Sequence, residues 1–188
     1  MNILLKLIGI IVAAMLAAGG FLWSGVYNIG ADSHHWWSTE WFVSLLRDRS
    51  IETRASSIRV PNLDDPHLIL KGAGQYAAMC TACHLAPGVK DSELRSGLYP
   101  LPPNLSGVRL DPGEAFWVIK HGIKMSAMPA WGGNHDDATI WSMVAFLQKL
   151  PDLSPQQYKD IVTKAPPDKD MEPNHTHRES DGMPMGHE

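Results

Sequence analysis

The side chains of this chain that point most directly to chemistry are Cys80, Cys83 and His84, in the run Cys-Thr-Ala-Cys-His. Two cysteines three residues apart lie one helical turn apart, so each thiol can add to one vinyl group of a single porphyrin. The histidine directly after the second thiol then places its imidazole under the porphyrin iron. The chain has no other cysteine, so haem attachment would use every thiol. The motif therefore predicts one covalently bound haem c.

Other uses of paired cysteines fit this sequence less well. A thioredoxin-like dithiol lies where a strand enters a helix, but the residues before Cys80 have a helical pattern and no segment alternates as a strand does. A structural zinc site normally needs four nitrogen or sulfur ligands, and this chain offers no second pair of cysteines. Haem attachment is therefore the interpretation that the residues favour.

Two segments on either side of the motif have helical periodicity. Residues 67–79 place Gly72 and Tyr76 at intervals of four from Cys80, which puts all three on one helical face. Residues 137–150 carry a dense apolar stripe at helical spacing. Because glycine has no side chain, another helix can approach closely where Gly72 lies. We expect these two helices to cross.

These features resemble the class I monohaem cytochrome c family. In that family, an N-terminal helix with a glycine, an aromatic residue and the first haem cysteine at intervals of four crosses a C-terminal helix with an aromatic-leucine pair. Gly72, Tyr76 and Cys80 match the first pattern. Phe146 and Leu147 match the second. The resemblance implies an all-α fold with a cytochrome c-like helical haem domain.

The resemblance extends over residues 66–152 and includes two loops. Pro103 opens the run Pro-Asn-Leu-Ser-Gly, which is similar to a family loop whose proline carbonyl accepts a hydrogen bond from the iron-bound imidazole. Met128 opens the run Met-Pro-Ala-Trp-Gly, which is similar to the family's distal ligand loop. The resemblance implies that His84 and Met128 bind the iron and that Pro103 orients the imidazole.

Other residues near these loops compete for the same roles. Met125 and His121 are the alternatives to Met128 as an iron ligand, and the proline after Met128, which favours an extended backbone, makes us prefer Met128. Any methionine can also serve as core packing. Three aromatic residues are expected to wall the haem and to exclude water: Tyr99, Trp117 and Trp131.

An uncharged segment precedes the haem domain. From Leu7 to Tyr27 there are 21 residues without a charge, long enough as a helix to cross about 30 Å of hydrocarbon. Lys6 before it predicts a cytoplasmic start and export of the rest. A cleavable signal peptide is the alternative, but the apolar run exceeds the about 7–15 residues of such signals. We expect residues 1–27 to anchor the protein in a bacterial inner membrane, with the haem domain in the periplasm.

Residues 28–65 are expected to form an amphipathic helix and a linker. His34 and His35 should be solvated hinge residues, and the helix follows them. Its apolar side chains can lie on the membrane surface, dock on a membrane partner, or pack on the haem domain, and these interpretations stay open. The side chains concerned are Trp36, Trp37, Trp41, Phe42, Leu45 and Leu46.

The C-terminal segment, residues 153–188, is rich in proline and polar residues and is expected to be disordered. Its last residues concentrate histidine and methionine. The residues concerned are His175, His177, Met183, Met185 and His187. Thioethers select Cu(I), whereas imidazoles suit Cu(II) or zinc. The tail is therefore either a solvated extension or a weak copper site.

The composition and the candidate site together narrow the function. A formal net charge of −4 gives no reason to expect nucleic acid, and no catalytic triad, carboxylate pair or nucleotide loop stands out. Iron with both axial positions filled has no open position for a substrate. We therefore expect a membrane-tethered carrier that passes single electrons between a respiratory donor and a terminal oxidase or reductase, or a cytochrome subunit of a larger complex. The alternative is a haem enzyme or a gas or peroxide sensor in which the methionine is displaced.

Overall fold

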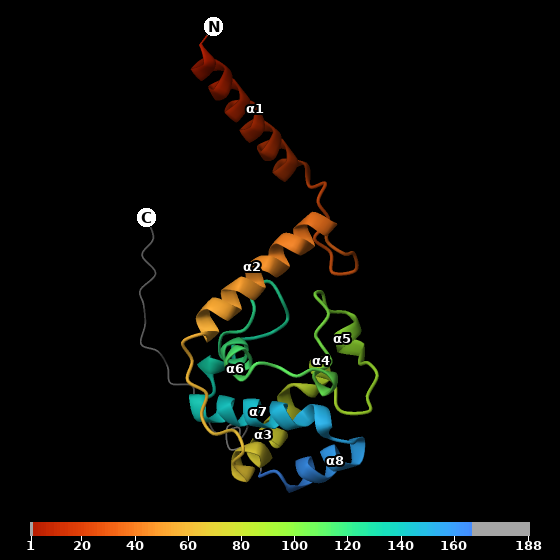
Figure 1. Ribbon diagram of the computed structural model, residues 1–188. Helices are drawn as coiled ribbons and strands as arrows, with labels where there is room; N and C mark the ends of the chain where they lie inside the picture. The colour runs from red at the N-terminus through yellow and green to blue at the C-terminus, as the bar shows by residue number, and fades with distance from the viewer. Residues whose placement is uncertain (1, 167–188) are drawn as a thin grey trace, which may run out of the picture.

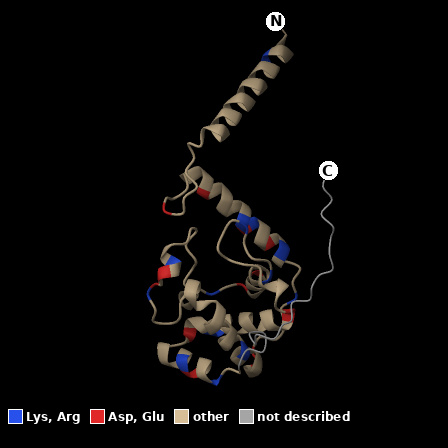
Figure 2. Cartoon of the chain, turned by 180° about the vertical axis from the view of Figure 1, so that it is seen from behind, with Lys and Arg blue, Asp and Glu red and all other residues tan. Residues whose placement is uncertain are grey.

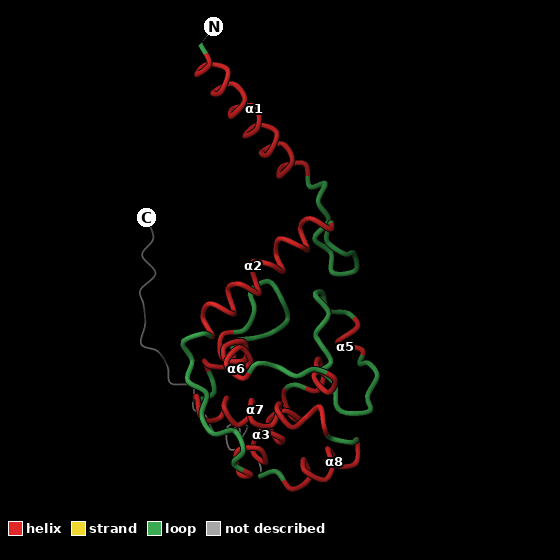
Figure 3. The backbone as a smooth tube through the Cα atoms, viewed as in Figure 1, coloured by secondary structure: helices red, strands yellow, loops and turns green. Residues whose placement is uncertain are grey.

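The computed structural model describes residues 2–166, and every regular element in that range is a helix (Figure 3). The α-helices are α1 Ile3–Ser24, α2 Trp37–Ala55, α3 Pro66–Met79, α4 Thr81–His84, α5 Glu93–Ser96, α6 Pro112–His121, α7 Asp137–Lys149 and α8 Pro155–Lys164. Single 3₁₀ turns lie at Leu105–Gly107, Trp131–Gly133 and Leu150–Asp152. The expected all-α fold is confirmed.

Three helices of the body begin with the same local device. A side-chain oxygen before the helix accepts a backbone N–H of the first turn, and a proline follows at the first helical position. Proline is favoured there because it has no N–H that would need an acceptor. The capping residues are Asp65 for α3, Asp111 for α6 and Ser154 for α8.

Helices α3 and α7 cross at the glycine that the sequence singled out. A Cβ atom at Gly72 would overlap the backbone carbonyl of Ser142, so only glycine permits this approach. One turn further along α3, the ring of Tyr76 lies 5.5 Å from that of Phe146, centroid to centroid. Both rings are fully buried. The expected crossing of these two helices is confirmed, and it forms the centre of the hydrophobic core.

Helix α8 differs from the disorder that we expected from residue 153 onward. A reciprocal capping pair between Ser154 and Gln157 starts the helix. The Tyr158 ring then packs on those of Tyr76 and Phe146, and it is only 8% exposed. The prediction of disorder was wrong over this helix, because composition does not show that one tyrosine completes the core. The candidate copper residues, His175 to His187, lie outside the described residues.

Helix α1 extends away from the body (Figure 1). None of its 22 residues is buried, and its most apolar window has a mean hydropathy of 2.3. It is long and apolar enough to cross a membrane by length and composition. It therefore fits a single-pass membrane anchor.

Helix α2 runs at an angle to α1, and the C-terminal end of α2 meets the body of the protein (Figure 1). Trp41, Phe42 and Val43 are all exposed, although consecutive helical residues point in directions about 100° apart. Charged residues instead gather in the C-terminal half (Figure 2). The polarity of α2 thus changes along its axis rather than around it, unlike that of the expected amphipathic helix.

The hinge between α1 and α2 is partly packed: His34 is exposed, as expected, but His35 is not. The ring of Trp36 lies 5.9 Å from that of Phe21 and 4.9 Å from that of Tyr27. The backbone N–H of His35 donates to the Tyr99 hydroxyl over 3.3 Å. His35 is half-buried, contrary to our expectation, because the segment between His84 and Pro103 brings Tyr99 to the hinge.

Candidate haem-binding site

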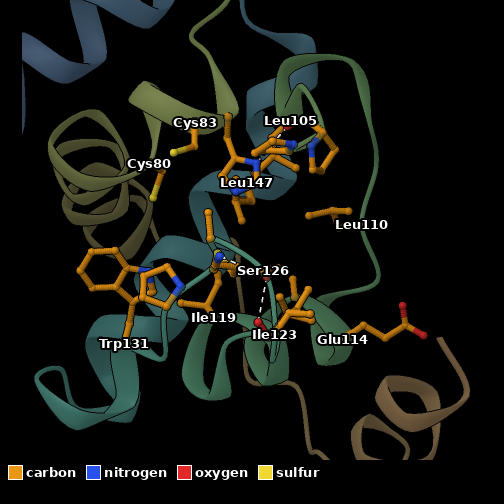
Figure 4. Close-up of a pocket in the computed structure, with 18 of the residues that line it drawn as sticks. Cys80, Cys83, Leu105, Leu110, Glu114, Ile119, Ile123, Ser126, Trp131 and Leu147 are labelled. Atoms are coloured by element: carbon orange, nitrogen blue, oxygen red, sulfur yellow. Dashed lines mark hydrogen bonds between the residues drawn. The ribbon is translucent and has the colours of Figure 1, made fainter. Parts of the chain in front are cut away.

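A cavity of about 530 Å³ lies between α3, α4, α6 and α7 (Figure 4). This volume is in the range of cofactor pockets. The cavity brings together four predicted side chains from two separate segments: Cys80, Cys83 and His84 from the first, and Met128 from the second. Most of its remaining lining is aliphatic, such as Leu105, Ile119 and Leu147, so it can cover the apolar faces of a porphyrin.

The two cysteines lie where α3 ends and the single turn of α4 begins. The backbone N–H of His84 donates to the Cys80 carbonyl over 2.8 Å, which holds the turn. Both thiols are free. Burial, together with the neighbouring Cys83, raises the pKa of the Cys80 thiol to about 12. A redox dithiol needs a lowered thiol pKa, so this environment does not suit one.

The imidazole of His84 has a fixed orientation. Its Nδ1–H donates to the carbonyl oxygen of Pro103 over 2.9 Å. Because a carbonyl can only accept, Nδ1 carries the proton and the lone pair is on Nε2. Burial lowers the pKa of His84 against the opposing effect of the hydrogen bond to Pro103, and the positive charge of Arg95 lowers it further. The neutral imidazole is the form that binds a metal.

Two further residues support this geometry, and the sequence did not single out the roles of their side chains. The Tyr76 hydroxyl donates to the Leu85 carbonyl over 2.5 Å and so fixes the chain just after His84. Arg95 is only 14% exposed, and its Nε–H donates to the Pro102 carbonyl over 2.9 Å. The only sign of the role of Arg95 in the sequence is that a basic residue lies in the segment between His84 and Pro103.

The chain after α6 folds back and brings Met128 into the cavity lining. Gly122 has a φ of 66°, and a Cβ there would lie 2.8 Å from the Met128 oxygen. The Ile123 N–H donates to the same oxygen over 3.1 Å. Met125 is 97% exposed, and His121 lies against the Trp117 ring, outside the cavity lining. Of these candidates, only Met128 is available to the cavity.

The three aromatic residues that we expected to line the haem pocket lie in different parts of the structure. Trp131 lines the cavity (Figure 4). Trp117 instead packs between His121 and the guanidinium of Arg54, 6.0 Å from its ring. Tyr99 packs against the hinge. Neither Trp117 nor Tyr99 lines this cavity, because Trp117 lies on the side of α6 near Arg54 of α2 and the segment after α5 carries Tyr99 to the hinge.

The donor set of this cavity fits haem c. It offers two free thiols one turn apart, a neutral imidazole with a free Nε2, and a thioether from a separate segment of the chain. The helix before the domain also contributes Arg47 and Ile51 to the lining, which the sequence did not suggest.

Comparisons with known proteins agree with this geometry. Residues 67–147 match the sequence model of the family described as "Cytochrome C oxidase, cbb3-type, subunit III". A protein of Pseudomonas aeruginosa named "Dihydro-heme d1 dehydrogenase" is 38% identical over 85 residues. That match covers 45% of this chain but only 16% of the relative. Residues 67–147 of this chain therefore form a c-type cytochrome domain, which implies haem c and electron transfer.

Proposed function

We propose that this chain is a membrane-tethered electron-transfer cytochrome with one covalent haem c. Cys80 and Cys83 would hold the haem through thioether bonds, while His84 and Met128 would bind the iron from opposite sides. Haem supplies an iron that alternates between the ferrous and ferric states. The observation that supports this most is the meeting of these four side chains in one cavity.

The protein's own groups would then tune the site. The Pro103 carbonyl orients the imidazole and increases its basicity. The Met128 thioether, a soft ligand, favours a higher reduction potential than a second imidazole would. Aliphatic walls exclude water. With both axial positions taken, the site suits a carrier rather than an enzyme.

We further propose that α1 holds the domain on the outer face of a bacterial inner membrane. There it would pass single electrons between a respiratory donor and a terminal oxidase or reductase. A tether raises the effective concentration of such partners without tight binding. The name of the Pseudomonas relative supports a second arrangement, in which the domain is the cytochrome subunit of a dehydrogenase complex.

Copper binding by the C-terminal residues stays a separate proposal. It rests on the sequence of His175, His177, Met183, Met185 and His187 alone. Titration of Cu(I) into the full chain and into a version ending at Pro166, which keeps the described residues, tests it. Equal copper uptake by the two would refute it.

Covalent attachment can be tested directly. Haem stain should survive denaturing electrophoresis of the wild-type protein and disappear in the double variant Cys80→Ala/Cys83→Ala. A folded wild-type protein without covalent haem would contradict the proposal. Carbon monoxide added to the reduced protein separates the two functional classes: an unchanged spectrum supports a carrier, and ready binding supports the enzyme or sensor.

A further inference from the structure

Helix α2 lies outside the matched cytochrome domain, yet it forms part of the cavity wall. Arg47 and Ile51 are one turn apart and line the cavity. One turn further, Ala55 is 7% exposed and packs beside Gly113 of α6. The stripe through residues 47, 51 and 55 thus places α2 against the haem domain.

This contact lies at the end of the cavity away from the cysteines. Figure 4 shows Cys80 and Cys83 on one side and Glu114 on the other, and Glu114 is close enough to α2 to interact with Asp48 and Glu52. A porphyrin that is attached through its vinyl groups carries its two propionates on the opposite edge. The propionates would therefore lie near the junction of α2 and α6.

The junction is rich in carboxylates. Asp48 and Glu52 face it from α2, and Asp111 and Glu114 from α6. Burial raises the pKa of Glu114, and these three neighbours add to the effect. Of the three arginines of α2, Arg49 pairs with Glu52 and the Arg54 guanidinium lies over the Trp117 ring. An added propionate there would need a cation to offset this charge.

Arg47 is the available cation. It is the only lysine or arginine among the described residues that line the cavity. Its side chain is 38% exposed, and its Nε–H donates to Asp48 over 2.7 Å. A guanidinium has five N–H donors in a planar fork, so the remaining donors can serve a second carboxylate.

We propose that Arg47 binds a propionate of the haem, so that a helix outside the cytochrome domain completes the cofactor site. The inference rests on the proposed function, because it requires bound haem. A positive charge beside the haem disfavours the ferric state and raises the midpoint potential. It also keeps the propionate ionised, so the potential varies little near neutral pH.

The experiment compares Arg47→Gln with Arg49→Gln in full-length, haem-loaded protein in detergent. Arg49 is the matched control, since it lies on the same helix, is exposed, and pairs with Glu52 instead of lining the cavity. Midpoint potentials are measured by redox titration from about pH 5 to about pH 8, where a propionate without its cation would titrate. Arg47→Gln should lower the potential, and its potential should fall more steeply with rising pH. Arg49→Gln removes the same charge from α2 without touching the cavity wall, so it should shift the potential less than Arg47→Gln does and leave its pH dependence like that of the wild type.

Equal potentials and pH profiles for the two glutamine variants would overturn the inference while leaving the haem assignment intact. Absence of covalent haem from the wild type would instead overturn the proposed function. If Arg47→Gln fails to load haem, the Arg47→Lys variant tests the contact with the propionate instead. A loaded Arg47→Lys protein with a potential near that of the wild type supports a cationic contact, whereas failure of both variants would refute it.

Discussion

The hydrogen bond from His84 to Pro103 depends on Arg95, which lies on the short helix α5 between them. Arg95 binds the Pro102 carbonyl through Nε and Asp91 through Nη1, over 2.9 and 3.0 Å. It therefore holds the peptide directly before the acceptor of the imidazole proton. The Ser92 side chain caps α5, the short helix that carries Arg95. From there the Arg95 side chain extends to the loop at Pro102.

Replacement of this arginine should loosen the proximal side of the site. Arg95→Met removes a part-buried charged hydrogen bond to the Pro102 carbonyl and an exposed ion pair with Asp91, and we expect it to lower the free energy of unfolding by about 1.5–3 kcal/mol. Urea unfolding of the haem-loaded protein, followed at the haem absorption band, measures this. Arg109→Met is the control, because its ion pair with Asp152 is exposed and such pairs contribute little. Equal effects of the two changes would contradict the role of Arg95.

The ligand on the distal side can be tested at the same scale. Met128→Ala should abolish the charge-transfer absorption of methionine-bound ferric haem and should open the iron to carbon monoxide. Met125→Ala should leave both properties unchanged, since that side chain is exposed. Retention of the absorption in Met128→Ala would show that another residue binds the iron.

Among the elements, the crossing of α3 and α7 is the most sensitive. A methyl group at Gly72 would force the Ser142 carbonyl away, so Gly72→Ala should lower the free energy of unfolding by about 1–3 kcal/mol or more. Gly107→Ala is the control, because a Cβ there would meet no atom within 4 Å. Thermal unfolding of both variants compares them, and a Gly72→Ala protein as stable as the control would refute the close packing.

What the sequence predicts about these elements depends on how local the signal is. The spacing of Gly72, Tyr76 and Cys80 predicts one helix and its crossing partner, because all three share a face. The helix at Tyr158 escapes prediction, because its stability comes from contacts with rings far along the chain. The contribution of Arg47 to the cavity escapes for the same reason: it depends on where α2 packs.

For the whole molecule, the proposed anchor predicts where the protein is found in the cell. The full chain should remain with the membrane after an alkaline carbonate wash and should be released by detergent, because α1 is apolar and unburied. A variant that lacks residues 1–27 should leave the membrane fraction. Fractionation with blotting measures both. A wild-type protein that is soluble and shortened would show instead that the segment is a cleaved signal.

The packed hinge has a consequence for how the domain meets other proteins. The rings of Tyr27 and Trp36 pack edge to face where α1 gives way to α2, and the Tyr99 hydroxyl accepts a hydrogen bond from the backbone of the hinge. With α1 in a bilayer, as we propose, the haem domain would not reorient freely relative to its membrane anchor. The domain would keep one orientation relative to α1 while the protein diffuses laterally in the membrane. Its encounters would then depend on how densely its partners populate the membrane plane, and each partner would have to offer its redox centre at one fixed height.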